Sequence, residues 1–277
     1  MAGNSGEPGR TVASKIFAVL DTFGDAGETL RLTDIAQRSG LPLPTAHRMV
    51  GELVAWGGLE RSEDGSYRIG QHMWAIGSVS PCMRRLRELG HPHLQELAAA
   101  TNANAQLAVL DGTDALFLDR VHGHGTPLIH TRVGGRLPLH ATAVGKVLLA
   151  HAPAAVRRDV VEGRLARFTP YTVQSPGRLA RELDDVRTRG VASSREELQQ
   201  GVVSVAAPVV HPDQGVIAAL GAVAASTVQE ARLVRAVRAA AAAMERDVAA
   251  DERTRQWAND GAAPAAAPGP RALPPPT

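Results

Sequence analysis

The chain has 277 residues, enough for two domains that each bury a core of their own. Hydrophobic residues make up 44% and aromatic residues 3%, a composition that is typical of folded, alanine-rich domains and excludes a largely disordered chain. The single cysteine, Cys82, excludes an intrachain disulfide, and the net charge of +2 does not by itself indicate a nucleic-acid partner. No apolar run has the length and continuity of a signal peptide or membrane span, so we expect a cytoplasmic protein with no membrane contact.

The residue pattern of the N-terminal region predicts three helices. After a Gly- and Pro-containing tail over residues 1–10, apolar residues spaced from 12 to 23 predict a first helix, and residues 29–32 are a short strand candidate. Thr33 is placed to cap a second helix that runs to Arg38 and ends at Gly40. Pro44 suits the first turn of a third helix, whose apolar face is formed by Ala46, Met49, Val50 and Leu53.

The third helix is followed by a hairpin signal. Residues 59–61 and 67–69 are strand-like, and Asp64-Gly65 between them favours a tight turn. Three helices and a hairpin predict a winged helix-turn-helix over residues 11–78, although the two short helices alone would also fit an ordinary helical hairpin. The residues expected to meet DNA lie on the outer face of the third helix and on the wing: Leu43, Pro44, Thr45, His47, Arg48, Arg61 and Arg68.

The remainder predicts an α+β domain. Apolar residues over 83–100, with Gly90 and Pro92 allowing a kink, predict a linker helix, which we assign to residues 79–100. Residues 101–257 alternate strands with helices and predict an antiparallel sheet, and the Pro- and Ala-rich residues 258–277 predict a disordered tail. The expected strands are 106–110, 115–121, 128–133, 202–210 and 216–223, and the expected helices are 141–151, 153–162, 176–189 and 228–250.

Helix boundaries in this domain carry local signals. Ser175-Pro176 predicts a helix start and Gly190 its end, and residues 227–230 form a capping-box pattern. Residues 140–146 resemble a phosphate-binding loop, but His140 and Val147 replace the glycine and hydroxyl that such a loop needs, which excludes a nucleotide site. We therefore expect Gly145 to serve close packing and Lys146 to be a surface or interface charge.

The sequence shows no catalytic arrangement. The histidines lack the spacing of a metal site, no nucleophile elbow is present, and Cys82 has no evident base partner. We expect no metal, no cofactor and no enzymatic activity.

Several stretches, taken together and in order, resemble the IclR family of bacterial transcription regulators: TVASKIFAVLDTF, LTDIAQRSGLPLPTAHRMVGELVAWGGLER, YRIG, RLPLHATAVGKVLLA and EELQQGVVSVAAPV. The resemblance covers about residues 11–250. It implies a winged helix, a linker helix, a GAF-like effector-binding domain, a homodimer or homotetramer, and a response to a small metabolite, often a carboxylate or aromatic acid.

The resemblance also implies a set of pocket residues: Ile129, Ala143, Val144, Ser194, Val202, Ser204 and Gly221. Where many relatives carry an acidic run, this chain reads Ser193-Ser194-Arg195-Glu196-Glu197. Arg195 either turns inward to pair an anionic effector or stays solvated or paired with a neighbouring glutamate. We also expect Gly221→Leu to block the response to the effector without weakening DNA binding in the absence of the effector.

The sequence thus predicts a regulator that binds operator DNA as an oligomer and is modulated by a compact, largely apolar effector. It does not distinguish a repressor from an activator. Two alternatives remain: a winged-helix module that binds a protein, which the acidic balance of residues 11–78 favours, and an enzyme on a GAF-like scaffold tethered by a helix-turn-helix.

Overall fold

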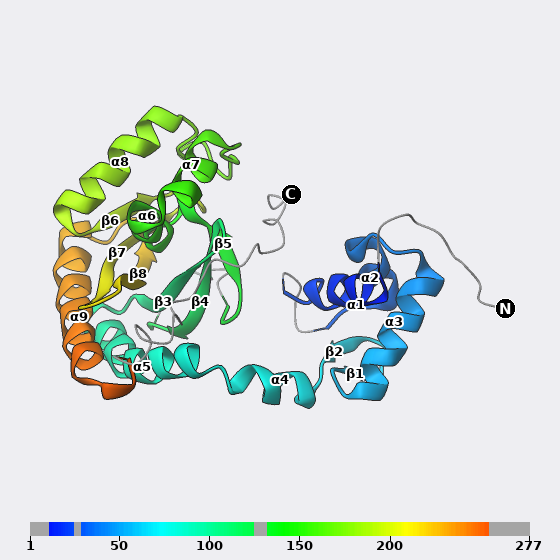
Figure 1. Ribbon diagram of the computed structural model, residues 1–277. Coiled ribbons are helices and arrows are strands. Elements are labelled where there is room, and N and C mark those ends of the chain that lie inside the picture. The colour runs from blue at the N-terminus through cyan, green and yellow to red at the C-terminus, as the bar shows by residue number, and fades with distance from the viewer. Residues whose placement is uncertain (1–10, 25–28, 125–131, 255–277) are drawn as a thin grey trace. The chain divides into compact units, whose positions relative to one another are not determined.

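The computed structural model describes residues 11–24, 29–124 and 132–254 of the chain. They fall into two compact units, residues 1–80 and 81–277, each with its own hydrophobic core (Figure 1). Within the described parts of the chain, no helix has the length and apolar character needed to cross a bilayer.

The first unit is a helical domain with a two-stranded wing. Thr11 caps its first helix by accepting a hydrogen bond from the Ser14 N–H at 3.1 Å. Leu59 to Arg61 pair antiparallel with Ile69 to Tyr67, which confirms the predicted hairpin. The elements are α1 (Val12–Asp21), α2 (Leu32–Ser39), α3 (Leu43–Trp56), β1 (Leu59–Arg61), β2 (Tyr67–Ile69) and α4 (Gln71–Ser78).

The second unit is built on one antiparallel sheet of six strands in the order β5-β4-β3-β8-β7-β6. Helices α5 and α9 cover one face, and α6 and α8 cover the other (Figure 1). Two apolar clusters fill the space on either side of the sheet, so the unit has the α+β architecture that the sequence predicts. Its elements are α5 (Pro81–Thr101), β3 (Asn104–Asp111), β4 (Asp114–Val121), β5 (Arg136–Pro138), η1 (Leu139–Ala141), α6 (Ala143–His151), α7 (Ala154–Glu162), α8 (Pro176–Arg189), β6 (Ala192–Arg195), β7 (Val202–His211), β8 (Gly215–Ala225) and α9 (Glu230–Ala250).

Two predicted helix starts are wrong. Helix α2 begins at Leu32, and its first turn is closed by Asp34, whose carboxylate accepts from the Arg31 N–H at 3.2 Å, so Thr33 lies inside the helix. Helix α9 begins at Glu230 after Gln229, with no side-chain cap. By contrast, Ser175 caps α8 and Gly190 ends it with a φ of 63°, as predicted.

The expected linker helix also differs from the structure. Helix α5 runs unbroken through Pro92 and belongs to the second unit, where Leu86, Leu94 and Leu97 pack into the core beside α9. The strand expected over 29–32 is reduced to a single bridge between Leu30 and Tyr67. The strand expected over 128–133 lies mostly outside the described residues, while β5 and β6 are strands that the sequence pattern missed.

Candidate functional sites

Helices α2 and α3 form a helix-turn-helix. Ile35, Ala36, Ala46 and Met49 are buried between them, and the small side chain of Ala36 lets the helices approach. Gly40 takes the left-handed conformation, with a φ of 64°, that the sharp turn requires. The predicted inward positions are therefore confirmed, and the remaining face of α3 is left to solvent.

The exposed face of α3 carries the residues expected to meet DNA. Leu43, Pro44, His47 and Arg48 are exposed and Thr45 is half-buried. Within residues 11–24, 29–124 and 132–254, Arg48 has no ion-pair partner, so its guanidinium is free to bind a base edge or a phosphate.

The two wing arginines lie in different surroundings. The Arg61 guanidinium lies 5.8 Å from the centre of the Tyr67 ring. Arg68 donates to Glu60 Oε2 from Nε at 3.0 Å and from a terminal nitrogen at 2.9 Å, and this hydrogen bond lowers the pKa of Glu60. Arg68 would have to leave Glu60 to neutralise a phosphate, which makes it a weaker candidate than Arg48.

In the second unit, two glycines allow close packing around helix α6. A Cβ on Gly145 would lie 2.5 Å from the Leu139 carbonyl oxygen and 2.5 Å from Thr142 Oγ1, which confirms that this glycine serves close packing. A Cβ on Gly221 would lie 2.9 Å from Val144 Cγ1 and 3.0 Å from the Val205 carbonyl oxygen. A leucine at position 221 would therefore press on Val144 of α6 and on the β7 backbone, and the selective loss of the effector response in Gly221→Leu stays a prediction.

A small cavity of about 40 Å³ lies where β6, β7 and β3 meet the η1 segment. Ser194 and Ser204 face each other in the register of β6 and β7, and both line the cavity with Val202. The Ser194 hydroxyl donates to the Ala141 carbonyl oxygen at 3.0 Å. The structure thus brings together three of the expected pocket residues, whereas Ala143, Val144 and Gly221 lie in the adjoining packing and Ile129 lies outside the described residues.

Sequence reasoning missed several residues of this cavity. Gln106 and Thr142 line it, as do Glu196 and Glu197 from the segment between β6 and β7. Gln106 had a detectable signal, because it is a polar residue on a strand whose neighbours are otherwise buried and mostly apolar. Glu196 and Glu197 had none, since their placement depends on β6, which the pattern did not predict.

Arg195 does not enter the small cavity. Along β6, Ala192 and Ser194 are buried while Ser193 and Arg195 are exposed. Arg195 donates to the Ser226 carbonyl oxygen at 2.9 Å and pairs with Glu230 at 3.3 Å. Of the two alternatives left open by the sequence, the structure shows the paired arginine.

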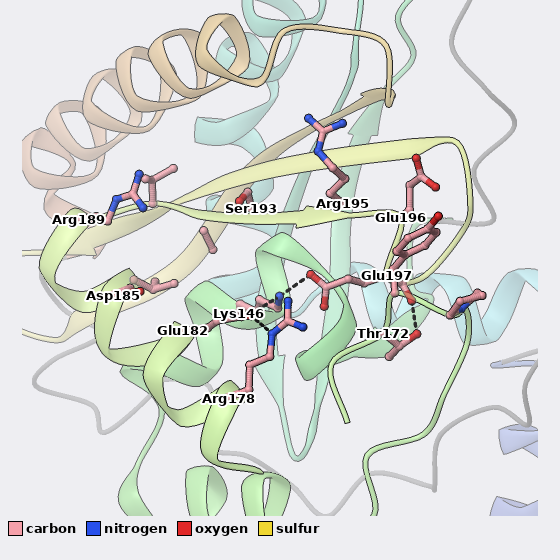
Figure 2. Close-up of a pocket in the computed structure, with 15 residues that line it drawn as sticks. Lys146, Thr172, Arg178, Glu182, Asp185, Arg189, Ser193, Arg195, Glu196 and Glu197 are labelled. Atoms are coloured by element: carbon pink, nitrogen blue, oxygen red, sulfur yellow. Dashed lines mark hydrogen bonds and ion pairs between the residues drawn. The ribbon is translucent and has the colours of Figure 1, made fainter. Parts of the chain in front are cut away.

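Arg195 instead borders a larger groove of about 660 Å³ beside α8 (Figure 2). Charged side chains of both signs line it, including Arg178, Glu182 and Glu197. Glu196 and Glu197 also line the small cavity, so the two hollows share a wall.

Lys146 contacts this shared wall from α6 and is buried, so it is not the surface or interface charge that the sequence predicted. Its side chain is 2% exposed, and Nζ lies 2.6 Å from Glu197 Oε1 and 2.7 Å from Glu182 Oε2 (Figure 2). Burial raises the pKa of Glu197. Burial opposes ionisation of Glu182 as well, but its bond to Lys146 lowers the pKa of that carboxyl overall. Lys146 therefore joins α6, α8 and the cavity wall.

The comparisons with known proteins bear on both units. Residues 12–63 match the family model of the IclR helix-turn-helix domain, and residues 83–246 match that of the bacterial transcriptional regulator IclR C-terminal domain. The chain is 34% identical over 209 residues to the regulator XynR of Escherichia coli, covering 73% of this chain and 81% of XynR. It is 33% identical over 240 residues to the glycerol operon regulatory protein of Streptomyces griseus, covering 84% and 94%.

A solved structure extends this likeness to the fold. An IclR homolog from Microbacterium hydrocarbonoxydans, complexed with 4-hydroxybenzoate, superimposes with a TM-score of 0.80 at 34% identity and covers 87% of this chain and 100% of its own. The helix-turn-helix unit and the sheet unit thus define a transcriptional regulator with a DNA-binding domain and an effector-binding domain. The chain belongs to the IclR family.

Proposed function

We propose that the exposed face of α3 enters the major groove of operator DNA and that Arg48 makes its main base-edge or phosphate contact. The supporting observation is the combination of a free Arg48 with His47 and Thr45 on one face of the second helix of a helix-turn-helix. Pro44 and Leu43 begin this helix, and Arg61 and Arg68 on the wing contribute backbone contacts.

The test is a DNA titration at fixed salt with Arg48→Ala. We expect affinity for the operator to fall by about 1–3 kcal/mol, while Arg235→Ala, an exposed arginine on α9, leaves it unchanged. Equal operator affinity for Arg48→Ala and the wild type would remove Arg48 from the interface. When the wild-type titration is repeated at rising salt, affinity should fall steeply as phosphate contacts are screened, and a chain that binds no DNA even at low salt would favour a protein partner.

We propose that the protein works as a homodimer or homotetramer in the cytoplasm, where it reaches chromosomal DNA. One helix-turn-helix reads only a few base pairs, and two-fold symmetry doubles the site. The first unit exposes large apolar side chains that a partner subunit would cover: Phe17 is 62% exposed, Trp74 73% and Val79 68%.

We propose that the small cavity is the effector site and that its effector is a compact organic acid. The start of α6 adjoins the cavity at Thr142, and a helix N-terminus favours a carboxylate. Ser204 offers a hydroxyl that makes no hydrogen bond within the described parts of the chain. The complex of the Microbacterium homolog with 4-hydroxybenzoate supports the same class of ligand.

We propose that the protein has no catalytic role. The ammonium of Lys146 is held between Glu182 and Glu197 at 2.7 and 2.6 Å, so it is not poised for acid-base chemistry. Effector binding instead changes the operator affinity of the helix-turn-helix.

A further inference from the structure

Gln106 is a buried amide with its hydrogen-bonding capacity unused. It lies on β3, its residue exposure is 4%, and it lines the small cavity. In residues 11–24, 29–124 and 132–254, no hydrogen bond of its side chain is found. No protein group among the described residues satisfies this amide, so its place on the cavity wall points to a ligand or a water as its partner.

The neighbours of Gln106 leave its amide room to meet a ligand. In the strand register Gln106 lies next to Gly221 of β8, and Ala206 of β7 lies beyond Gly221. Val144 of α6 packs over Gly221, so the space open to a ligand lies instead beside Val223 of β8, which pairs with Ser204 and lines the cavity with Gln106 and Ser194. A ligand in this space would have one end at Gln106 and the other toward the serines.

The charges of the cavity restrict what that ligand carries. Among the described residues, its lining includes two acidic residues, Glu196 and Glu197, and no lysine, arginine or histidine. Lys146 lies behind Glu197 and is already shared by two carboxylates. A second acidic group on the effector would therefore face negative charge without a cation to offset it.

We propose that Gln106 selects the effector, by pairing with a neutral hydroxyl, carbonyl or amide at the end of the molecule away from its carboxylate. An amide both donates and accepts, so it satisfies a hydroxyl in both senses. An analogue that lacks the hydroxyl leaves the amide unpaired, and a second carboxylate is repelled. This inference rests on the proposed effector function and specifies the ligand that the site prefers.

The cavity volume fits a water at Gln106 before the effector binds. About 40 Å³ is enough for a water, whereas pockets for small organic molecules measure about 300–1,000 Å³. Binding must therefore widen the cavity, and residues Glu196 to Gln199, which line it between β6 and β7, are the part of its wall that lies outside regular strands.

The experiment measures binding of three probes to the full chain by calorimetry: 4-hydroxybenzoate, benzoate and terephthalate. We expect 4-hydroxybenzoate to bind about tenfold to a hundredfold more tightly than either of the others. In Gln106→Met the preference over benzoate should disappear through loss of 4-hydroxybenzoate affinity. The control is Gln214→Met, which removes an amide that also lacks hydrogen-bond partners among the described residues but lies outside the cavity, and it should keep the preference.

A second variant, Gln106→Asn, keeps the test valid if Gln106→Met does not fold. Gln106→Asn keeps an amide but withdraws it by one methylene, so it should reduce the preference without abolishing it. Equal binding of 4-hydroxybenzoate and benzoate to the wild type, or a preference that persists in Gln106→Met, would overturn the role of Gln106 and leave the effector site standing. Binding of none of the three probes would overturn the proposed acid effector itself.

Discussion

Replacing Lys146 by methionine tests how the cavity wall is held. The Lys146 ammonium lies 2.6 Å from Glu197 and 2.7 Å from Glu182, and the side chains of Lys146 and Glu197 are 2% and 8% exposed. At an effective dielectric constant of about 20, one such pair is worth about 6 kcal/mol, most of which offsets the cost of burying the charges. Lys146→Met removes only the cation and leaves two carboxylates together, so we expect the free energy of unfolding to fall by about 3–5 kcal/mol.

The matched control for Lys146→Met is Arg178→Met. Arg178 also pairs with Glu182, at 3.0 Å, but its side chain is 61% exposed, so its loss should cost at most about 1 kcal/mol. Adding Glu197→Gln to Lys146→Met removes the stranded buried charge and should restore part of the stability.

The assay must read the second unit alone. Trp56 and Trp74 lie in the first unit and Trp257 lies outside the described residues, so tryptophan fluorescence would not follow the sheet unit alone. Urea unfolding with hydrogen exchange of β7 and β8 reports on the sheet directly. If Lys146→Met and Arg178→Met lose the same stability, the buried ion pair does not hold the wall and the reasoning is refuted.

Three further predictions follow from the same contacts. Gly145→Ala should destabilise the second unit by about 1–3 kcal/mol, because the added Cβ would overlap Leu139 and Thr142. The control Gly177→Ala, whose Cβ would have nothing within 4 Å, should change the stability by less than about 1 kcal/mol. Similar thermal shifts for both variants would argue against tight packing at the start of α6. Burial lowers the pKa of His140, so the unfolded chain binds a proton at this residue more readily than the folded chain does. The free energy of unfolding should therefore fall as pH drops below about 6.5. Unfolding measured at several pH values should show a smaller dependence on pH in His140→Gln than in the wild type. Trp74→Ser should weaken subunit association measured by light scattering, whereas Tyr171→Ser, which replaces an exposed aromatic residue of the second unit, should not. A monomeric wild type would contradict the proposed oligomer.

Local signals predicted those parts of the fold that local chemistry determines. Ser175, Pro176 and Gly190 mark both ends of α8, and Asp64-Gly65 marks the wing, because caps and tight turns need particular residues within a few positions. Strands β5 and β6 were missed because three or four residues at a sheet edge show too little alternation to detect.

The site was less predictable, because it depends on contacts between distant segments. Lys146 meets Glu182 and Glu197, which lie 36 and 51 residues further along the chain, and no local pattern encodes that meeting. Because β6 was not predicted, its alternation was not predicted either, in which Ser194 is buried and Arg195 is exposed. Ser194 and Ser204 were found through the family resemblance, whereas the signal of Gln106, a polar residue on a mostly apolar strand, was overlooked.

The central claim is that an acid bound in the small cavity changes DNA binding by α3. The direct measurement is operator affinity of the full chain at fixed salt, with and without saturating 4-hydroxybenzoate, in the wild type and in Ser204→Val. We predict that the acid shifts wild-type operator affinity by about 5-fold to 150-fold and that Ser204→Val, which removes a cavity hydroxyl, reduces the shift at the same acid concentration. Operator affinity that stays the same while the acid demonstrably occupies the cavity would contradict the claim.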